Sequence, residues 1–469
     1  MRFSNITAAP YISSPFRTFS SGVKLDSVTS NLLVLLVMVC GLIFGLCVRA
    51  AQVSVSPKPP NIIFIMADDL GYGDLGCYGQ KRFKTPRLDQ MASEGVRFTQ
   101  YYAGSTVCAP SRSVLMTGLH TGHTRIRGNG QVPLDYGDLT VAEILKKKHY
   151  DTCVLGKWGL GEAGSTGLPN LQGFDEWFGF LNQKKAHNHY PDVVWRNQEL
   201  WYFPENDNGK EGLFIHYKFT DAAINYINMQ RENPFFLYLA YTVPHKRVIA
   251  PTAKPYQNED WPEPQKMLAA MIFRLDRDVG KILDALDAKE LSENTVIFFC
   301  SDNGPHNQEG VDPEFFQSSG PFRGIKRDLY EGGIRSPMIV RWKGKIQPGQ
   351  TSDQVWAAWD VFPTLSELAG IKPPIGLDGE SMVEPLMKGK TKDHAPLYWE
   401  FHEKGFHQAA RMDDWKAVRH AVDASLELYD LSKDPGETQD VSGENRRIVN
   451  RMTSFLKSAR SDSEEWPLP

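Results

Sequence analysis

The segment Cys108-Ala109-Pro110-Ser111-Arg112 combines a single thiol with a fixed positive charge, just before a run, residues 113–118, that predicts a helix. Pro110 suits the first turn of such a helix, because the N–H that proline lacks would have no partner there. A thiol at a helix N-terminus lies at the positive end of the helix dipole, and Arg112 adds to that field. These residue types are consistent with a reactive nucleophile at Cys108 and also with a buried cysteine at a turn.

Acidic side chains follow two apolar runs at the point where each run ends. Asp68 and Asp69 come directly after the run that begins at Asn61, and Asp302 and Asn303 follow residues 295–300. Because ligands in open α/β sheets bind beyond the carboxyl ends of strands, we expect these side chains to meet at one edge of a sheet. Their carboxylates would repel one another unless a cation neutralised them, and oxygen ligands favour Ca²⁺ or Mg²⁺ over zinc. The sequence therefore predicts a divalent metal site here.

The rest of the chain must position these groups, and it alternates strand and helix signals. Continuous apolar runs are typical of parallel strands that are covered on both faces. Their alternation with amphipathic helices predicts an α/β fold, in which helices sandwich a large, mostly parallel central sheet. The predicted strands are residues 61–66, 151–155, 235–241, 295–300 and 338–342, and the predicted helices are residues 139–148, 219–231, 266–286 and 361–369.

The C-terminal part has a different pattern, with shorter runs that are separated by turns after Pro373-Pro374. We expect a small antiparallel sheet with one helix, formed by strands at residues 396–401, 415–419 and 426–431 and a helix at 445–457. The predicted boundaries are residues 1–50 for a signal peptide or signal anchor, 51–60 for a linker, 61–372 for the catalytic domain and 373–469 for the C-terminal subdomain.

Residues 32–48 form an apolar run that borders on transmembrane length. The small residues Val48 and Ala50 provide an acceptable cleavage site, which favours a signal peptide over an uncleaved anchor. In either case we expect the mature domain to be exported, to the periplasm, the extracellular space or an endomembrane lumen. Membrane contact is expected only if the segment stays uncleaved.

The pattern Cys-x-Pro-Ser-Arg at Cys108, together with residues 105–118 as a whole, resembles the active-site segment of the type I sulfatases, the formylglycine-dependent arylsulfatase family of the alkaline phosphatase-like superfamily. In that family a formylglycine-generating enzyme oxidises the cysteine to Cα-formylglycine, so the resemblance implies this modification at Cys108. One hydroxyl of the hydrated aldehyde attacks sulfur, and the other, once deprotonated, expels sulfate and regenerates the aldehyde. The resemblance thus implies a sulfuric ester hydrolase.

Further motifs of the family match this chain in the expected order, from Asn61 to about Leu431. The resemblance implies that the metal, normally calcium, is held by the two acidic pairs and touched by the hydrate at residue 108. It implies that Arg112 holds the hydrate, and that the sulfate is contacted by a lysine after a strand, a histidine in a Pro-His pair and a late lysine. The positions of this sequence that the resemblance implies are Asp68, Asp69, Cys108, Asp302 and Asn303 as metal ligands, and Cys108, Arg112, Lys157, His245 and Lys326 as catalytic residues.

The electrostatics of sulfate-ester cleavage agree with these types of residue. Negative charge shifts onto the leaving oxygen as the S–O bond breaks, and the cation, Lys157 and Lys326 would hold it. His245 or Lys326 could protonate that oxygen, and histidine is the more natural acid near neutral pH.

Gly159 departs from the family pattern, because the family often carries a histidine there that takes the proton triggering sulfate release. Glycine cannot act as a base, so another group must do this, or turnover is impaired. The candidates are His187, His189 and His306, of which we favour His187. Substrate contact by His187 or His306, or a solvated loop histidine, remains the alternative.

Composition limits the partners of the chain. The net charge of −4 and the absence of a basic run argue against nucleic-acid binding. Of six cysteines, Cys40 and Cys47 lie in the targeting segment, and modification of Cys108 would leave three, so no disulfide framework is implied. The expected partners are a sulfated small molecule or polysaccharide as substrate and the formylglycine-generating enzyme.

Two other functions remain open at this point. A phosphate or phosphonate ester hydrolase of the same superfamily would share most of the site. A catalytically weak protein that binds sulfated glycans is suggested by Gly159 alone. Aromatic residues at Trp195, Trp201 and Tyr202 predict either sugar stacking or a small satellite core.

Overall fold

The computed structural model describes residues 58–403 and 405–469, together with Asp26, Val28, Leu32, Leu35, Leu36, Met38 and Val39. Apart from those seven residues, the predicted targeting segment, residues 1–50, and most of the linker lie outside the described residues. Within the described part of the chain, we find no helix that is both long and apolar enough to cross a bilayer. Residues Pro59–Pro469 form one compact unit.

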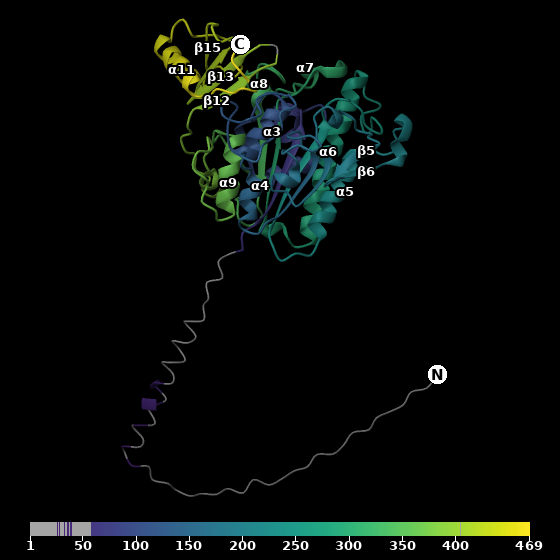
Figure 1. Ribbon diagram of the computed structural model, residues 1–469, viewed down its shortest axis with the longest axis vertical. Coiled ribbons are helices and arrows are strands. Elements are labelled where there is room, and N and C mark those ends of the chain that lie inside the picture. The colour runs from purple at the N-terminus through teal and green to yellow at the C-terminus, as the bar shows by residue number, and fades with distance from the viewer. Residues whose placement is uncertain are drawn as a thin grey trace. The chain divides into compact units, whose positions relative to one another are not determined.

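An eleven-stranded sheet runs through this unit in the order β10-β2-β9-β8-β1-β7-β3-β4-β5-β6, with β11 pairing β2 (Figure 1). The five neighbours from β8 to β4 are all parallel, and antiparallel pairs flank them at β9 and β5. This confirms the predicted mostly parallel central sheet. Its strands are β1 (Asn61–Asp68), β2 (Val96–Tyr102), β3 (Asp151–Lys157), β4 (Glu176–Phe180), β5 (Val193–Arg196), β6 (Glu199–Tyr202), β7 (Phe235–Pro244), β8 (Thr295–Ser301), β9 (Arg335–Arg341), β10 (Gln350–Ser352) and β11 (Trp356–Ala357).

The central strands are apolar because helices cover both faces of the sheet. Every residue of β1, β7 and β8 is buried. Ile62, Phe64 and Met66 of β1 pack on the face covered by α3, α4 and α9, whereas Ile63 and Ile65 pack on the face covered by α2, α5 and α6 (Figure 1). These helices are α2 (Pro86–Ser93), α3 (Cys108–Thr117), α4 (Val141–Lys146), α5 (Ile215–Asn228), α6 (Glu263–Ala288) and α9 (Val361–Leu368).

A second, antiparallel sheet of four strands lies in the C-terminal part, with α11 packed on it, drawn in yellow in Figure 1. The sheet with one helix was predicted, but its second strand was not. That strand, His-Gln-Ala-Ala-Arg-Met, is poor in β-branched residues, and it is held by pairing to a neighbour on each side. The elements are β12 (Leu397–Phe401), β13 (His407–Met412), β14 (Trp415–Arg419), β15 (Glu427–Asp430) and α11 (Arg446–Ser458), and the remaining short helices are α7 (Pro313–Phe316), α8 (Glu331–Ile334) and α10 (Val383–Lys388).

The predicted strands and helices all occur, with shifts of a few residues at their ends. The largest shifts are in α3, which begins at Cys108 where residues 113–118 were predicted, and in α5, which spans Ile215–Asn228 where residues 219–231 were predicted. Strand β2 was not predicted, because its alternation of apolar and polar residues is interrupted between Phe98 and Tyr101, where a register shift against β9 occurs. The short strands β4, β5, β6, β10 and β11 were not predicted either.

Candidate active site

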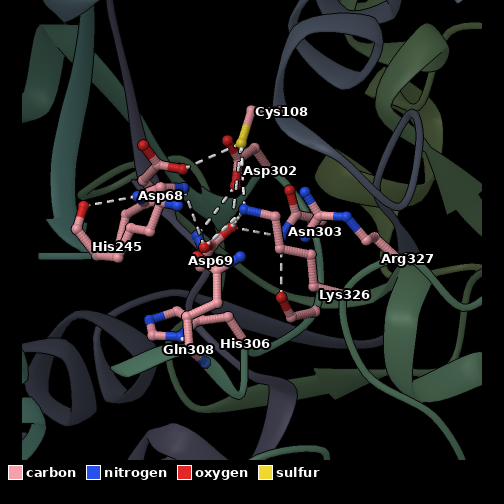
Figure 2. Close-up of polar contacts among 12 residues, drawn as sticks. Asp68, Asp69, Cys108, His245, Asp302, Asn303, His306, Gln308, Lys326 and Arg327 are labelled. Atoms are coloured by element: carbon pink, nitrogen blue, oxygen red, sulfur yellow. Dashed lines mark hydrogen bonds and ion pairs between the residues drawn. The ribbon is translucent and has the colours of Figure 1, made fainter. Parts of the chain in front are cut away.

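Four neighbouring parallel strands deliver charged side chains to one edge of the sheet. Asp68 is the last residue of β1, Lys157 the last of β3, and His245 and Asp302 each follow directly after β7 and β8. Because the carboxyl ends of parallel strands meet at the same edge, residues far apart in sequence gather here (Figure 2). All four side chains are buried.

Helix α3 brings the thiol to this edge. Cys108 is its first residue, after the extended N-cap residue Val107. The Cys108 Sγ lies 3.4 Å from Asp68 Oδ1, 4.0 Å from Asp69 Oδ1 and 3.5 Å from Lys326 Nζ (Figure 2). Burial raises the pKa of the thiol to about 12, although the two lysines oppose this rise. The buried thiol is therefore protonated at neutral pH and is not itself a ready nucleophile.

Arg112, one turn further along α3, ties the helix to the strand ends. Its Nη2 lies 2.7 Å from Asp302 Oδ2 and 3.7 Å from Asp68 Oδ2, and its Nη1 donates to the carbonyl of Lys157 at 2.8 Å. This guanidinium is wholly buried. It thus fixes the relative positions of α3, β3 and β8.

Two lysines neutralise the first acidic pair. Lys157 Nζ lies 2.7 Å from Asp68 Oδ2, and Lys326 Nζ lies 2.6 and 2.7 Å from the two carboxylate oxygens of Asp69. Burial alone would raise the pKa of Asp68, but Lys157 and the other neighbouring cations outweigh burial and hold this pKa below the usual range. Burial and repulsion from Asp68 raise the pKa of Asp302 to about 6, because together they exceed the lowering effect of Arg112.

The donor set suits a hard divalent cation. The Oδ1 atom of Asn303 is buried and has no hydrogen-bond partner among the described residues, while its Nδ2 donates to Asp69 Oδ1 at 2.7 Å. Asp69 adopts a left-handed φ of 64°, and its N–H donates to Asp302 Oδ1 at 3.1 Å. One ligand atom each from Asp68, Asp69, Cys108 and His245 lies within 4.8 Å of the others. Carboxylate oxygens and an unpartnered amide oxygen that converge in this way fit Ca²⁺ or Mg²⁺.

His245 presents an unprotonated nitrogen to this cluster. Its Nδ1 donates to the carbonyl of Lys246 at 2.8 Å, and its Nε2 lies 3.3 Å from Asp69 Oδ2. Burial holds the pKa of His245 well below its usual value, so the ring is neutral and Nε2 carries a lone pair. Two acceptors that face one another in this way require a proton or a cation between them.

The three histidines that could act as the base that Gly159 cannot provide differ in whether their ring nitrogens have hydrogen-bond partners. His306 donates from Nε2 to the carbonyl of Pro244 at 3.3 Å, and its Nδ1 accepts the N–H of Gln308 at 3.1 Å. His189 is wholly buried, and its Nε2 lies 3.1 Å from the carbonyl of His245. Both rings are thus tied to the protein itself.

His187 is different, because neither of its ring nitrogens has a partner among the described residues. Its ring stacks on that of His245, with centroids 4.4 Å apart and planes inclined by 19°. Burial, followed by repulsion from Lys157, lowers its pKa to about 4. His187 is therefore the neutral histidine with free nitrogens beside the cluster.

Two residues near the site were not singled out from the sequence. Asn129 Oδ1 accepts the N–H of Ala109 at 3.0 Å, which satisfies one of the free donors in the first turn of α3. Gln183 Nε2 lies 3.3 Å from the carbonyl of Gly159. Neither residue belongs to a motif with a chemical signature, so nothing in their spacing indicates these contacts.

The remaining cysteines lie apart from these groups. Cys153 and Cys300 are buried in β3 and β8, as expected for small core residues, and Cys77 is half-buried. The described cysteines are all free thiols. Trp195 packs partly against the core, whereas Trp201 and Tyr202 of β6 are exposed.

Comparison with known proteins gives a consistent set of relatives. A family model described as Sulfatase matches residues 60–371, and one described as N-sulphoglucosamine sulphohydrolase, C-terminal, matches residues 323–462. The N-acetylgalactosamine-6-sulfatase of Homo sapiens is 32% identical over 460 residues, which covers 86% of this chain and 86% of the relative. The N-acetylgalactosamine-6-O-sulfatase of Bacteroides thetaiotaomicron is 28% identical over 504 residues and covers 86% of this chain and 94% of the relative. The crystal structure of Ps i-CgsB in complex with k-i-k-neocarrahexaose has a TM-score of 0.75 at 30% identity and covers 86% of this chain and 92% of that chain.

Proposed function

Since this chain belongs to the sulfatase family of sulfuric ester hydrolases, we propose that it removes sulfate from a sulfated carbohydrate with a Cα-formylglycine made from Cys108 and a bound Ca²⁺ or Mg²⁺. Relatives that cover most of the chain are named as sulfatases of N-acetylgalactosamine 6-sulfate. These names support a carbohydrate sulfate as the substrate class.

The position of Cys108 carries the proposal. Its side chain lies within 3.5 Å of both an aspartate oxygen and a lysine nitrogen, yet burial keeps the thiol protonated. The side chain at position 108 thus lies where a nucleophile is needed, but the protonated thiol is a poor nucleophile. This supports the conversion of Cys108 to another chemical group. Formylglycine, when formed, supplies a hydrated aldehyde, with one hydroxyl to attack sulfur and a second to expel sulfate. Conversion requires a formylglycine-generating enzyme as a maturation partner.

The metal ion would be held by Asp68, Asp69, Asp302 and Asn303, with residue 108 beside it. It would supply positive charge against the oxygens of the sulfate group. The unpartnered Oδ1 of Asn303 and the carboxylates around it support this assignment. A bound ion would also relieve the facing acceptors on Asp69 and His245.

The arginine and the two lysines of the site have different roles. Arg112 orients Asp302 and the end of β3 through its two hydrogen bonds. Lys157 and Lys326 hold negative charge on the sulfate group in a buried site, where electrostatic interactions are strong. Burial would lower the pKa of Lys326, but Asp69 and Cys108 raise it above its usual value, so this lysine keeps its proton.

The proton transfers are assigned to two histidines and Lys326. His245 can protonate the leaving oxygen once an anion in the site raises its pKa, and Lys326 is the alternative donor. We assign to His187 the acceptor role that a histidine at position 159 would have, because its free nitrogens lie beside His245. His306 is assigned to hold Pro244 and the adjoining His245 in place, rather than to contact the substrate.

Export is part of the proposal, through the N-terminal apolar run of residues 32–48. Export predicts that the enzyme acts on sulfated carbohydrates outside the cytoplasm. Cleavage of the segment is testable by N-terminal sequencing of the secreted protein.

The activity is tested by producing the chain together with a formylglycine-generating enzyme. Hydrolysis of an aryl sulfate is compared with that of the matching phosphate and phosphonate monoesters, with and without a chelator. We expect the sulfate ester to be preferred and the chelator to inhibit. Cys108→Ala should abolish activity while Cys77→Ala, which removes a half-buried thiol elsewhere, should not. Preference for phosphate or phosphonate, or undiminished activity of Cys108→Ala, would overturn the proposal.

A further inference from the structure

A pocket of about 480 Å³ is lined by residues 129–133, 159, 161, 162 and 182–185, which belong to three segments that lead into the cluster around Cys108. We name it the amide pocket, after the side chains of Asn129, Gln131, Asn182 and Gln183 in its wall. Its volume is within the range typical of small-ligand sites.

Each of three wall segments of the amide pocket is directly connected to the site. Asn129 accepts a hydrogen bond from Ala109, the residue after Cys108. Gly159 follows Lys157 by two residues at the end of β3. Lys184 and Lys185 precede His187, whose ring stacks on His245. A ligand in this pocket is therefore held next to a sulfate group bound at the cluster.

The pocket depends on glycine at position 159. A Cβ on Gly159 would lie 2.1 Å from Gln183 Nε2, so any side chain there would displace Gln183. The Gly159 N–H donates to the carbonyl of Leu181 at 2.9 Å, which fixes the two segments against each other. Glycine at position 159 thus leaves room for the amide side chain of Gln183 in this wall.

The chemistry of the wall fits a hydroxyl-rich anion. Gln183 Oε1 is buried and has no hydrogen-bond partner among the described residues. Lys184 and Lys185 are exposed and form no ion pair within the described part of the chain. The carboxylate of Glu162 is engaged by Asn182 Nδ2 at 3.1 Å. Amides suit sugar hydroxyls, and the two free ammonium groups suit a second sulfate or a carboxylate.

We propose that the amide pocket binds the sugar unit next to the sulfated one, and that Lys184 and Lys185 contact an anionic group on that unit. The substrate is then an anionic oligosaccharide rather than an isolated monosaccharide sulfate. This inference rests on the proposed sulfatase function, and it makes Gln183 a specificity-determining residue.

The test compares kcat/KM for an aryl sulfate, which has no second sugar, with kcat/KM for sulfated tetrasaccharides from chondroitin sulfate and from carrageenan. We expect at least one tetrasaccharide to be preferred over the aryl sulfate. A double variant, Lys184→Ala with Lys185→Ala, should lower the ratio of tetrasaccharide to aryl sulfate about tenfold, because two exposed charged contacts of modest strength are lost together. Gln183→Ala should lower the ratio in the same direction.

A matched control is available at the other end of β3. Lys147 and Lys148 are also consecutive and exposed, and they follow α4 just before β3 begins. The double variant Lys147→Ala with Lys148→Ala should leave the ratio unchanged.

Different results would contradict the sulfatase function and the assignment of the amide pocket. Aryl sulfate hydrolysis without any preference for a tetrasaccharide, or an unchanged ratio in the Lys184 and Lys185 variant, would overturn the pocket assignment alone. Absence of hydrolysis of every sulfate ester by the formylglycine-containing protein would overturn the sulfatase function itself.

Discussion

The side chain of Gln183 fills the space that a side chain on residue 159 would need, because a Cβ on Gly159 would lie 2.1 Å from Gln183 Nε2. The backbone of Gly159 also has a left-handed φ of 78°, which L-residues with a side chain rarely adopt. Glycine is thus favoured at this position by its backbone conformation, and a side chain there would also have to displace the end of the Gln183 side chain.

Gly159→Ala should destabilise the fold by more than the conformational cost of about 1–2 kcal/mol. Gly164→Ala is the matched control, because Gly164 has a φ of 80° but no atom within 4 Å of its Cβ position. In the double variant Gly159→Ala with Gln183→Ala, the part of the destabilisation that exceeds the conformational cost should disappear. The measurement is the free energy of unfolding in denaturant, and equal effects of the two glycine variants would contradict the account.

Asp302→Asn should weaken divalent metal binding at least about 10–100-fold, the loss that follows when even an outer-shell partner of a metal ligand is removed. Asp276→Asn is the control, because this buried carboxyl accepts the N–H groups of Arg87 and Leu88 far from the cluster and has a pKa raised to about 7 by burial. Calcium titration by calorimetry gives both affinities. Full retention of calcium by Asp302→Asn would mean that the ion binds elsewhere.

His187→Gln should lower kcat about 100-fold, the lower end of the range for loss of a proton-transfer group. If His187 takes the proton that releases sulfate, rapid mixing should show an undiminished first turnover followed by a slow steady state. His149→Gln, at an exposed position before β3, should change neither phase. An equal loss in both phases would assign His187 to substrate binding instead.

His394 couples the stability of the fold to pH. Burial would lower its pKa, but Asp360 Oδ2 at 2.8 Å from Nε2 outweighs burial and raises the pKa to about 9. Because the folded pKa lies above the unfolded value of about 6.5, the stabilisation is complete below that pH and is lost as the pH rises through 9.

His394→Gln should therefore reduce the free energy of unfolding by about 3 kcal/mol more at pH 6 than at pH 10, from a shift of roughly 2.5 pH units. The same substitution in an Asp360→Asn background should show little dependence on pH. A difference between wild type and His394→Gln that stays constant from pH 6 to pH 10 would contradict this assignment.

Much of the fold follows from local patterns that need no tertiary information. The buried strands β1, β7 and β8 are continuous apolar runs, and acidic residues at the ends of two of them predict where the cluster forms. Parallel pairing of β1 with both β7 and β8 then brings Asp68, His245 and Asp302 together, as strand-end topology requires.

Other contacts depend on tertiary structure that local patterns do not encode. Strand β13 exists because β12 and β14 pair with it, and its composition alone favours no strand. Asn129 and Gln183 reach the site from loops whose paths are set by packing. The free nitrogens of His187, compared with the engaged ones of His189 and His306, also become visible only in three dimensions.

Conversion of Cys108 to formylglycine changes the mass of the tryptic peptide of residues 98–112, which mass spectrometry measures. The protein is produced in a host that modifies a reference sulfatase in the same culture. We predict a mass in which one sulfur and two hydrogens are replaced by one oxygen. A peptide with unmodified cysteine, beside a fully modified reference sulfatase, would contradict the account.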